Sequence, residues 1–164
     1  MRGMETTSSF HDPTAAPADA SGEPRISYVV ARLERALRRS INERVSVHGL
    51  TVLQYTTLSV LGRRGALSNA QLARRAYMSP QAMSEVIEAL EAKGLIERSQ
   101  HPNHRRVYPA GLTREGRRVL AACERAVDEL EQEMLRDLSP TERDALRHGL
   151  VSAVRALHAG LPER

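Results

Sequence analysis

Aromatic residues and cysteines are scarce in this sequence, and each scarcity excludes a class of protein. Aromatics make up only 3% of the 164 residues and tryptophan is absent, so the core must be aliphatic. A core of Leu, Val, Ala and Ile with few β-branched runs favours a mainly helical fold. Cys123 is the only cysteine, which excludes an intrachain disulfide and a metal site built from several cysteines.

Long apolar runs are also missing. None approaches the ~18 residues that a membrane-spanning helix needs, and the N-terminus lacks the apolar stretch of a signal peptide. We therefore expect a cytoplasmic protein of about one domain, with no membrane partner.

Lysine is nearly absent, since Lys93 is the only one among 24 basic residues. The planar fork of arginine suits phosphates and guanine edges, although codon usage in a GC-rich genome produces the same bias. The charge is distributed unevenly: residues 61–118 carry a net +6, whereas residues 1–24 and 119–164 each carry −3. A positive excess in the central part of the chain is typical of a phosphate-binding surface.

The first part of the chain contains a polar tail and two predicted helices. Residues 1–24 are rich in Ser, Thr, Pro, Ala and Gly without any apolar period, which predicts a disordered tail. Apolar residues recur at helical spacing over about residues 26–47, with arginines on the opposite face. Gly49 is expected to end this helix, and a capping box that begins at Thr51 predicts the next.

Residues 67–113 form the central unit of the chain, around which the other segments are arranged. A capping box beginning at Ser68 opens a short third helix. Ser79 and Pro80 open a fourth, with serine as N-cap and proline at the first helical position, and Gly94 ends it. A short helix, a turn and a longer helix in this order predict a helix-turn-helix.

Two short strands follow, at about residues 95–98 and 107–112, on either side of the basic loop HPNHRR. Pro109 lies within the second strand, where it removes a ladder donor, so this strand must be an edge or kinked there. The fold class is therefore mainly α (α+β). It is a winged helix-turn-helix over about residues 50–113, with a two-stranded β-wing.

Two further helices complete the chain. Thr113 is predicted to cap a long fifth helix with an acidic polar face, and Ser139 opens a sixth through a third capping box. The apolar stripes of the helices at about 26–47 and 113–160 are longer than one small winged domain needs. They could pack on each other or on a second chain, and residues 25–164 are expected to form a single domain.

The series of motifs resembles the MarR family of transcriptional regulators. These motifs are GLT before the second helix, LSNAQLA, SPQA, LEAKGLIER, a basic wing, and LT opening a long helix. The resemblance covers roughly residues 26–158. It implies a homodimer joined by the first, fifth and sixth helices, which binds double-stranded DNA at a palindromic promoter site. It also implies release by a small, often phenolic, ligand, so we expect the protein to act as a repressor.

The fourth helix is expected to enter the major groove through its N-terminal half. Its apolar stripe is predicted to be buried, which leaves four positions near its start facing outward: Gln81, Ala82, Ser84 and Glu85. Glutamine can pair with adenine, alanine can contact a thymine methyl group, and glutamate can accept from cytosine N4. Ser79 could cap this helix while the free backbone amides of the first turn point toward a phosphate. Arg74 and Arg75 are predicted to bind the DNA backbone, or else to pair with acids of the same subunit.

The wing departs from the family pattern. The family usually has Asp-Xaa-Arg here, with the arginine reaching into the minor groove and the aspartate orienting it. This chain has His104, Arg105 and Arg106, so Arg106 matches the arginine while His104 replaces the aspartate. We expect Arg106 to be more mobile and the wing more positive, with all three residues contacting DNA.

In the family, the effector pocket usually lies between the dimer helices and the winged lobe. Tyr28, His48 and Tyr55 are placed so that they could line it. Each could instead be a packing or surface residue.

A metal- or redox-responsive winged-helix regulator of another family is the nearest alternative. The six histidines are scattered and supply no evident metal site, so no metal or other cofactor is expected. Cys123 lies on the apolar line of the fifth helix, where a buried inert thiol is favoured over a sensor. The motifs of common enzyme classes are missing, so the chain is not expected to be an enzyme. A winged helix used only for protein contact is a third alternative. The basic wing argues against it, because such a protein would not need it.

The histidine in the wing predicts a pH dependence. The pKa of an unperturbed histidine is about 6.5, so protonation of His104 should strengthen DNA binding as the pH falls from about 8 to about 6. A binding titration over this range measures it, with His104→Ala as the control. The hypothesis fails when wild type and His104→Ala show the same pH dependence.

Overall fold

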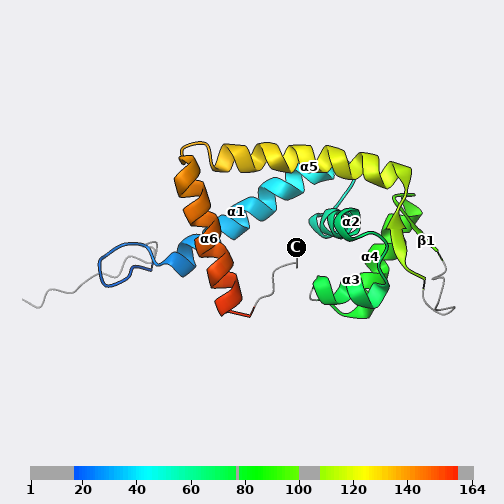
Figure 1. Ribbon diagram of the computed structural model, residues 1–164, viewed down its shortest axis with the longest axis horizontal. Coiled ribbons are helices and arrows are strands. Elements are labelled where there is room, and N and C mark those ends of the chain that lie inside the picture. Colours follow the sequence, from blue (N-terminus) through cyan, green and yellow to red (C-terminus); the bar gives the residue numbers. More distant parts are fainter. Residues whose placement is uncertain (1–16, 77, 100–107, 159–164) are drawn as a thin grey trace, which may run out of the picture. The chain divides into compact units, whose positions relative to one another are not determined.

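A computed structural model describes residues 17–76, 78–99 and 108–158 of the chain (Figure 1). Its elements are α1 (Ile26–Ser46), α2 (Val52–Arg64), α3 (Asn69–Arg75), α4 (Pro80–Ala92), β1 (Ile96–Arg98), β2 (Ala110–Leu112), α5 (Arg114–Met134) and α6 (Pro140–Ala156). The fold class predicted from the sequence, mainly helical with a two-stranded wing, is confirmed. No helix of the described residues is both long and apolar enough to cross a membrane.

The chain divides into two units, Met1–Arg39 and Ser40–Arg164. In the first unit, Asp19 accepts hydrogen bonds from the backbone amides of Ser21 at 2.8 Å and Glu23 at 3.3 Å. Residues 17–24 thus form a hydrogen-bonded turn ahead of α1. The predicted disordered tail stays a prediction for residues 1–16, which lie outside the described residues.

The helix starts follow the predicted caps closely, because each is set by residues three positions apart in the sequence. In every case the hydroxyl of the cap residue accepts from the backbone amide three residues later, which satisfies an otherwise unpaired donor. These caps are Thr51, Ser68, Ser79, Thr113 and Ser139, of which Thr51, Ser68 and Ser139 form full capping boxes.

The core of the second unit is aliphatic, as the composition predicted. It joins α2, α3, α4, both strands and the N-terminal half of α5, and its most buried large side chains are Leu58, Leu61, Leu72, Met83, Leu90 and Ile96. Burial of this apolar surface is the main stabilising contribution to the winged lobe.

The wing is shorter than predicted. β1 pairs antiparallel with β2, with Ile96 opposite Leu112, and β2 begins only at Ala110. Strands were expected at about 95–98 and 107–112, with an edge or a kink at Pro109, whereas Tyr108 and Pro109 precede β2. Pro109 has no amide to donate, so it precedes the strand. Ala110 also exchanges backbone hydrogen bonds with Leu67, at 2.8 and 3.0 Å, on the side away from β1.

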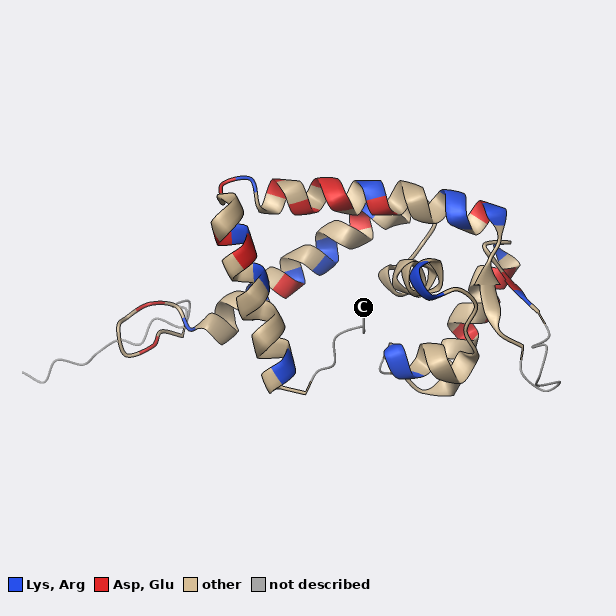
Figure 2. Cartoon of the chain, viewed as in Figure 1, with Lys and Arg blue, Asp and Glu red and all other residues tan. Residues whose placement is uncertain are grey.

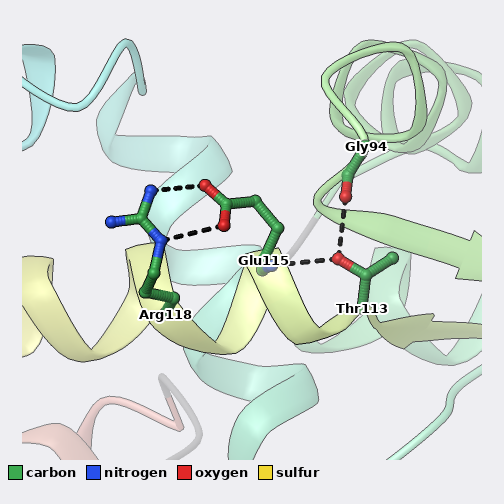
Figure 3. Close-up of polar contacts among 5 residues, drawn as sticks. Gly94, Thr113, Glu115 and Arg118 are labelled. Carbon is green, nitrogen blue, oxygen red and sulfur yellow. Dashed lines mark hydrogen bonds and ion pairs between the residues drawn. The ribbon is translucent and has the colours of Figure 1, made fainter.

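The start of α5 is fastened to the corner between α4 and β1 (Figure 3). The Thr113 hydroxyl donates to the carbonyl of Gly94 at 2.7 Å and accepts from the amide of Gly116 at 2.9 Å. Glu115 and Arg118 form an exposed ion pair beside it, and the hydrogen bond from Arg118 lowers the pKa of the Glu115 carboxyl. Gly116 lies so close to this corner that an added Cβ would stand 1.9 Å from the carbonyl oxygen of Leu95.

This contact predicts that Gly116→Ala destabilises the protein, because backbone must shift to admit the methyl group. We expect a loss of at least about 2 kcal/mol in the free energy of unfolding, measured by urea titration at fixed protein concentration. The control is Gly149→Ala in α6, where an added Cβ meets no heavy atom within 4 Å. There the substitution should stabilise the helix by about 0.5–1 kcal/mol. Equal stability of Gly116→Ala and wild type would contradict the assigned contact.

Candidate nucleic-acid interface

The helix-turn-helix consists of α3 and α4, which pack against each other. Of the four residues predicted to form the buried stripe of α4, Met83, Ile87 and Leu90 are at most 2% exposed, whereas Val86 is only partly buried against the core. Gln81 and Glu85 lie on the opposite, exposed face. Two of the four predicted outward positions, Ala82 and Ser84, are only half-exposed. Of these four residues, Gln81 and Glu85 therefore contribute most to the exposed face of the first two turns of α4.

Ser84 is already engaged within the protein. Its hydroxyl donates to the carbonyl of Pro80 at 3.1 Å and accepts from the side-chain amide of Asn69 at 2.7 Å. The same amide donates to the Pro80 carbonyl at 2.9 Å. Asn69 was not expected to be part of the site, because nothing in the neighbouring sequence indicates a contact with residues 11 and 15 positions further along the chain.

Ser79 caps α4, and its hydroxyl accepts from the amide of Ala82 at 3.2 Å. Ser79 and Pro80 are exposed, so the first turn of α4 is open to solvent. Amides at such an end favour an anion through both hydrogen bonding and the helix dipole. The start of α4 is therefore chemically suited to a phosphate as well as to base edges.

Exposed arginines end the two helices that precede α4 (Figure 2). Arg74 and Arg75 lie in the last turn of α3, and Arg63 and Arg64 lie in the last turn of α2. None of the ion pairs found among the described residues includes any of the four. Arginines here also complement the helix dipoles. Arg63 and Arg64 were not singled out from sequence, although two adjacent arginines at a helix end were the available signal.

His104, Arg105 and Arg106 lie outside the described residues, so their roles stay predictions. At the base of the wing, Arg98 of β1 pairs with Glu91 of α4 at 3.0 Å. This pair links the wing to the C-terminal half of α4.

Lys93 lies at the other end of α4. Its ammonium donates to the carbonyl of Gly49 at 2.5 Å and to the side-chain oxygen of Gln54 at 2.9 Å. Gln54 is 9% exposed and also accepts from the amide of Thr51 in the capping box of α2. The only lysine of the chain therefore joins α4 to the turn between α1 and α2.

A hollow of about 580 Å³ lies between α2, β2 and α5. Its apolar part includes Leu61, Leu112 and Leu120, and its charged groups are Arg63, Arg117 and Glu124. Such a size is ordinary for a small-molecule site. Gly62 lies against Leu120, since an added Cβ there would stand 2.7 Å from that side chain.

The three residues expected from sequence to bind a ligand are not among those that line this hollow. Tyr28 belongs to the first unit, where the guanidinium of Arg32 lies 5.9 Å from the centre of its ring. His48 is exposed in the turn after α1. Tyr55 is half-buried against the core, and burial, with a smaller contribution from Glu124, raises the pKa of its phenol.

The chain is similar to known proteins in sequence and in fold. The model of the MarR family matches residues 50–108. The HTH-type transcriptional repressor Rv2887 of Mycobacterium tuberculosis is 32% identical over 123 residues, which cover 74% of this chain and 88% of that protein.

Two solved structures have a similar fold, each at 22% identity and a TM-score of 0.70. A cysteine-to-serine variant of MarR from E. coli, complexed with operator DNA, covers 79% of this chain and 93% of its own. CouR from Rhodococcus jostii RHA1, bound to p-coumaroyl-CoA, covers 78% of this chain and 90% of its own.

The environment of Cys123 predicts an unreactive thiol. Its side chain is 0% exposed, and burial raises the pKa of the thiol, with a smaller contribution from Glu124. Because the thiolate is the reactive form, alkylation by iodoacetamide should be at least about tenfold slower in the native protein than in denaturant. Mass spectrometry measures both rates, and a cysteine placed at Val47, which is 82% exposed, is the fast-reacting control. Rapid native labelling that abolishes DNA binding would instead identify a sensor.

Proposed function

Because the chain belongs to the MarR family of transcriptional regulators, we propose that it is a repressor that binds a palindromic operator as a homodimer. The observation that carries the proposal is the exposed start of α4, with Gln81 and Glu85 facing outward and the arginine-rich end of α3 beside it in the chain. Such a surface combines groups that read base edges with cations that bind phosphates. The family is a family of regulators and not a class of enzymes.

Within this proposal, the residues divide into two kinds. Gln81 and Glu85 read bases in the major groove, while Ala82, half-exposed beside them, contacts a thymine methyl group. Ser79, Arg74 and Arg75 bind the backbone, together with three residues of the wing: His104, Arg105 and Arg106. Ser84 contributes chiefly by its hydrogen bonds within the protein.

Exposed apolar side chains support the homodimer. In α6, Leu146 and Leu150 are each 37% exposed, and Leu157 just after it is 79% exposed. In α1, Ile26 is 82% exposed. Apolar side chains at helical spacing on terminal helices are suited to a two-fold interface with a second copy of the chain.

The proposed mechanism is repression by occupancy in the cytoplasm. Two α4 helices of a two-fold dimer would enter major grooves about one DNA turn, roughly 34 Å, apart and read inverted half-sites. Contacts with phosphates release counterions, so affinity should fall steeply as salt rises. A ligand that prefers another spacing of the two helices would release the operator.

We place the effector in the hollow between α2, β2 and α5. Its leucines suit an apolar or phenolic body, and Arg63 and Arg117 suit an anionic group. CouR, which shares the fold, was solved with p-coumaroyl-CoA, a ligand of this general character. A screen of small phenols and carboxylates for release of the bound duplex, repeated with Leu120→Trp to fill the hollow, tests this site. Release that is unchanged in Leu120→Trp would count against it.

The proposed function predicts that the wild-type chain selects one duplex from a random-sequence DNA pool. The selected duplex should contain an inverted repeat whose half-sites are centred about 10 base pairs apart. Selection followed by sequencing, with an electrophoretic shift on the winning duplex, measures both features. Selection of no preferred sequence would contradict sequence-specific binding, and an asymmetric site would contradict the homodimer.

Two variants separate base reading from backbone binding on that duplex. Gln81→Ala should change the preference at particular base pairs, by about 1–3 kcal/mol each. Arg106→Ala should weaken binding to all sequences. It should also reduce the slope of the logarithm of the binding constant against the logarithm of the salt concentration by about one. A uniform loss across sequences in Gln81→Ala would contradict its assigned role.

A further inference from the structure

Two polar side chains hold the recognition helix α4, one near each end. Neither belongs to the buried apolar stripe of the helix. We propose that Asn69 and Lys93 are positioning residues, which orient α4 so that its exposed side chains can discriminate bases. This inference rests on the proposed function. It assigns neither residue a contact with DNA.

Asn69 holds the N-terminal end. Its amide nitrogen donates to the carbonyl of Pro80 at 2.9 Å and to the hydroxyl of Ser84 at 2.7 Å, and that hydroxyl donates to the same carbonyl at 3.1 Å. The three groups form a closed triangle between the first turn of α3 and the first two turns of α4. The side-chain oxygen of Asn69 is buried without a partner among the described residues, so the orientation of the amide is set by its two donor contacts.

The two residues that Asn69 holds are neighbours of the proposed base readers. Pro80 directly precedes Gln81, and Ser84 directly precedes Glu85. A shift of either anchored residue would therefore move an adjacent reading side chain by a similar distance.

Lys93 holds the C-terminal end. It caps α4, and its ammonium donates to the carbonyl of Gly49 and to the side chain of Gln54. Gln54 is itself fixed, because its side-chain oxygen also accepts from the amide of Thr51 at 3.2 Å. Charge-assisted hydrogen bonds of this kind are short and directional.

Between the two ends, α4 is attached mainly through Met83, Ile87 and Leu90. Apolar burial stabilises the packing, but it is non-directional and tolerates small rotations of a helix. Hydrogen bonds weaken steeply when their angle is poor. The buried stripe therefore determines which face of α4 is inside, and the polar contacts determine its orientation more closely.

The two kinds of DNA contact differ in how much misorientation they tolerate. A hydrogen bond to a base edge needs its donor and acceptor in place, whereas flexible exposed arginines can still reach phosphates. Removing either polar contact should therefore lower the ratio of specific to non-specific affinity. Affinity for unrelated DNA should change little.

The experiment uses the full chain, the labelled duplex that wild type selects from a random pool, and a scrambled duplex of equal length. The measured quantity is the ratio of the two dissociation constants, with active protein counted by stoichiometric titration. Asn69→Ala and Lys93→Met should each lower this ratio about tenfold, the size of one misread base pair. Affinity for the scrambled duplex should stay within about threefold.

Three control variants isolate the orienting contacts. Ser68→Ala removes the N-cap of α3 next to Asn69 but none of the hydrogen bonds between Asn69 and α4. Arg125→Met removes one exposed positive charge from α5, as Lys93→Met does from α4. Lys93→Arg retains donors at position 93. All three should keep the specificity ratio within about threefold of wild type.

Circular dichroism and urea unfolding establish that each variant is folded, and Lys93→Gln replaces Lys93→Met should the latter not fold. An unchanged ratio in both Asn69→Ala and the folded variant at Lys93 would overturn the proposal. So would an equal loss in Ser68→Ala, because it would show that only the stability of α3 matters. A wild-type chain that prefers no duplex would instead contradict the proposed function.

Discussion

The close approach of α5 to the corner between α4 and β1 is the constraint on which the winged lobe depends. Gly116 has no room for a side chain against the Leu95 carbonyl, and Thr113 bonds to both Gly94 and Gly116. This contact brings the end of the recognition helix, the start of the wing and the start of the long helix to one place. A movement of α5 would therefore displace both elements that are proposed to contact DNA, so an effector bound beside α5 could act on them directly.

Polar side chains determine the orientation of α4 more closely than apolar packing does. The stripe of Met83, Ile87 and Leu90 buries one face of α4, and hydrophobic burial alone does not select one orientation closely. Asn69 and Lys93 supply directional contacts at the two ends. The exposed arginines at the ends of α2 and α3, by contrast, lie outside any ion pair found among the described residues. They are suited to a mobile counter-charge such as a phosphate backbone.

Local sequence signals predicted the framework because they act over three or four residues. Each capping hydroxyl bonds to an amide three positions away, and the buried stripe of α4 follows the helical period. The exposed positions of Gln81 and Glu85 follow from that stripe. The series of short motifs also resembled one family, and the family-model match over residues 50–108 together with the 32% identical relative confirms it.

Contacts between distant segments were decided only by the tertiary structure. Ser84 was expected to face outward, but Asn69, 15 residues earlier, engages its hydroxyl. The wing strand starts after Pro109 and bonds to Leu67, 43 positions before Ala110. The hollow beside α5 collects side chains from three elements, so no short motif marks it. The sequence by itself determined the helices, their caps and the family, because these depend on neighbours along the chain. The orientation of α4 and the lining of the hollow depend on neighbours in space, which the chain acquires only on folding.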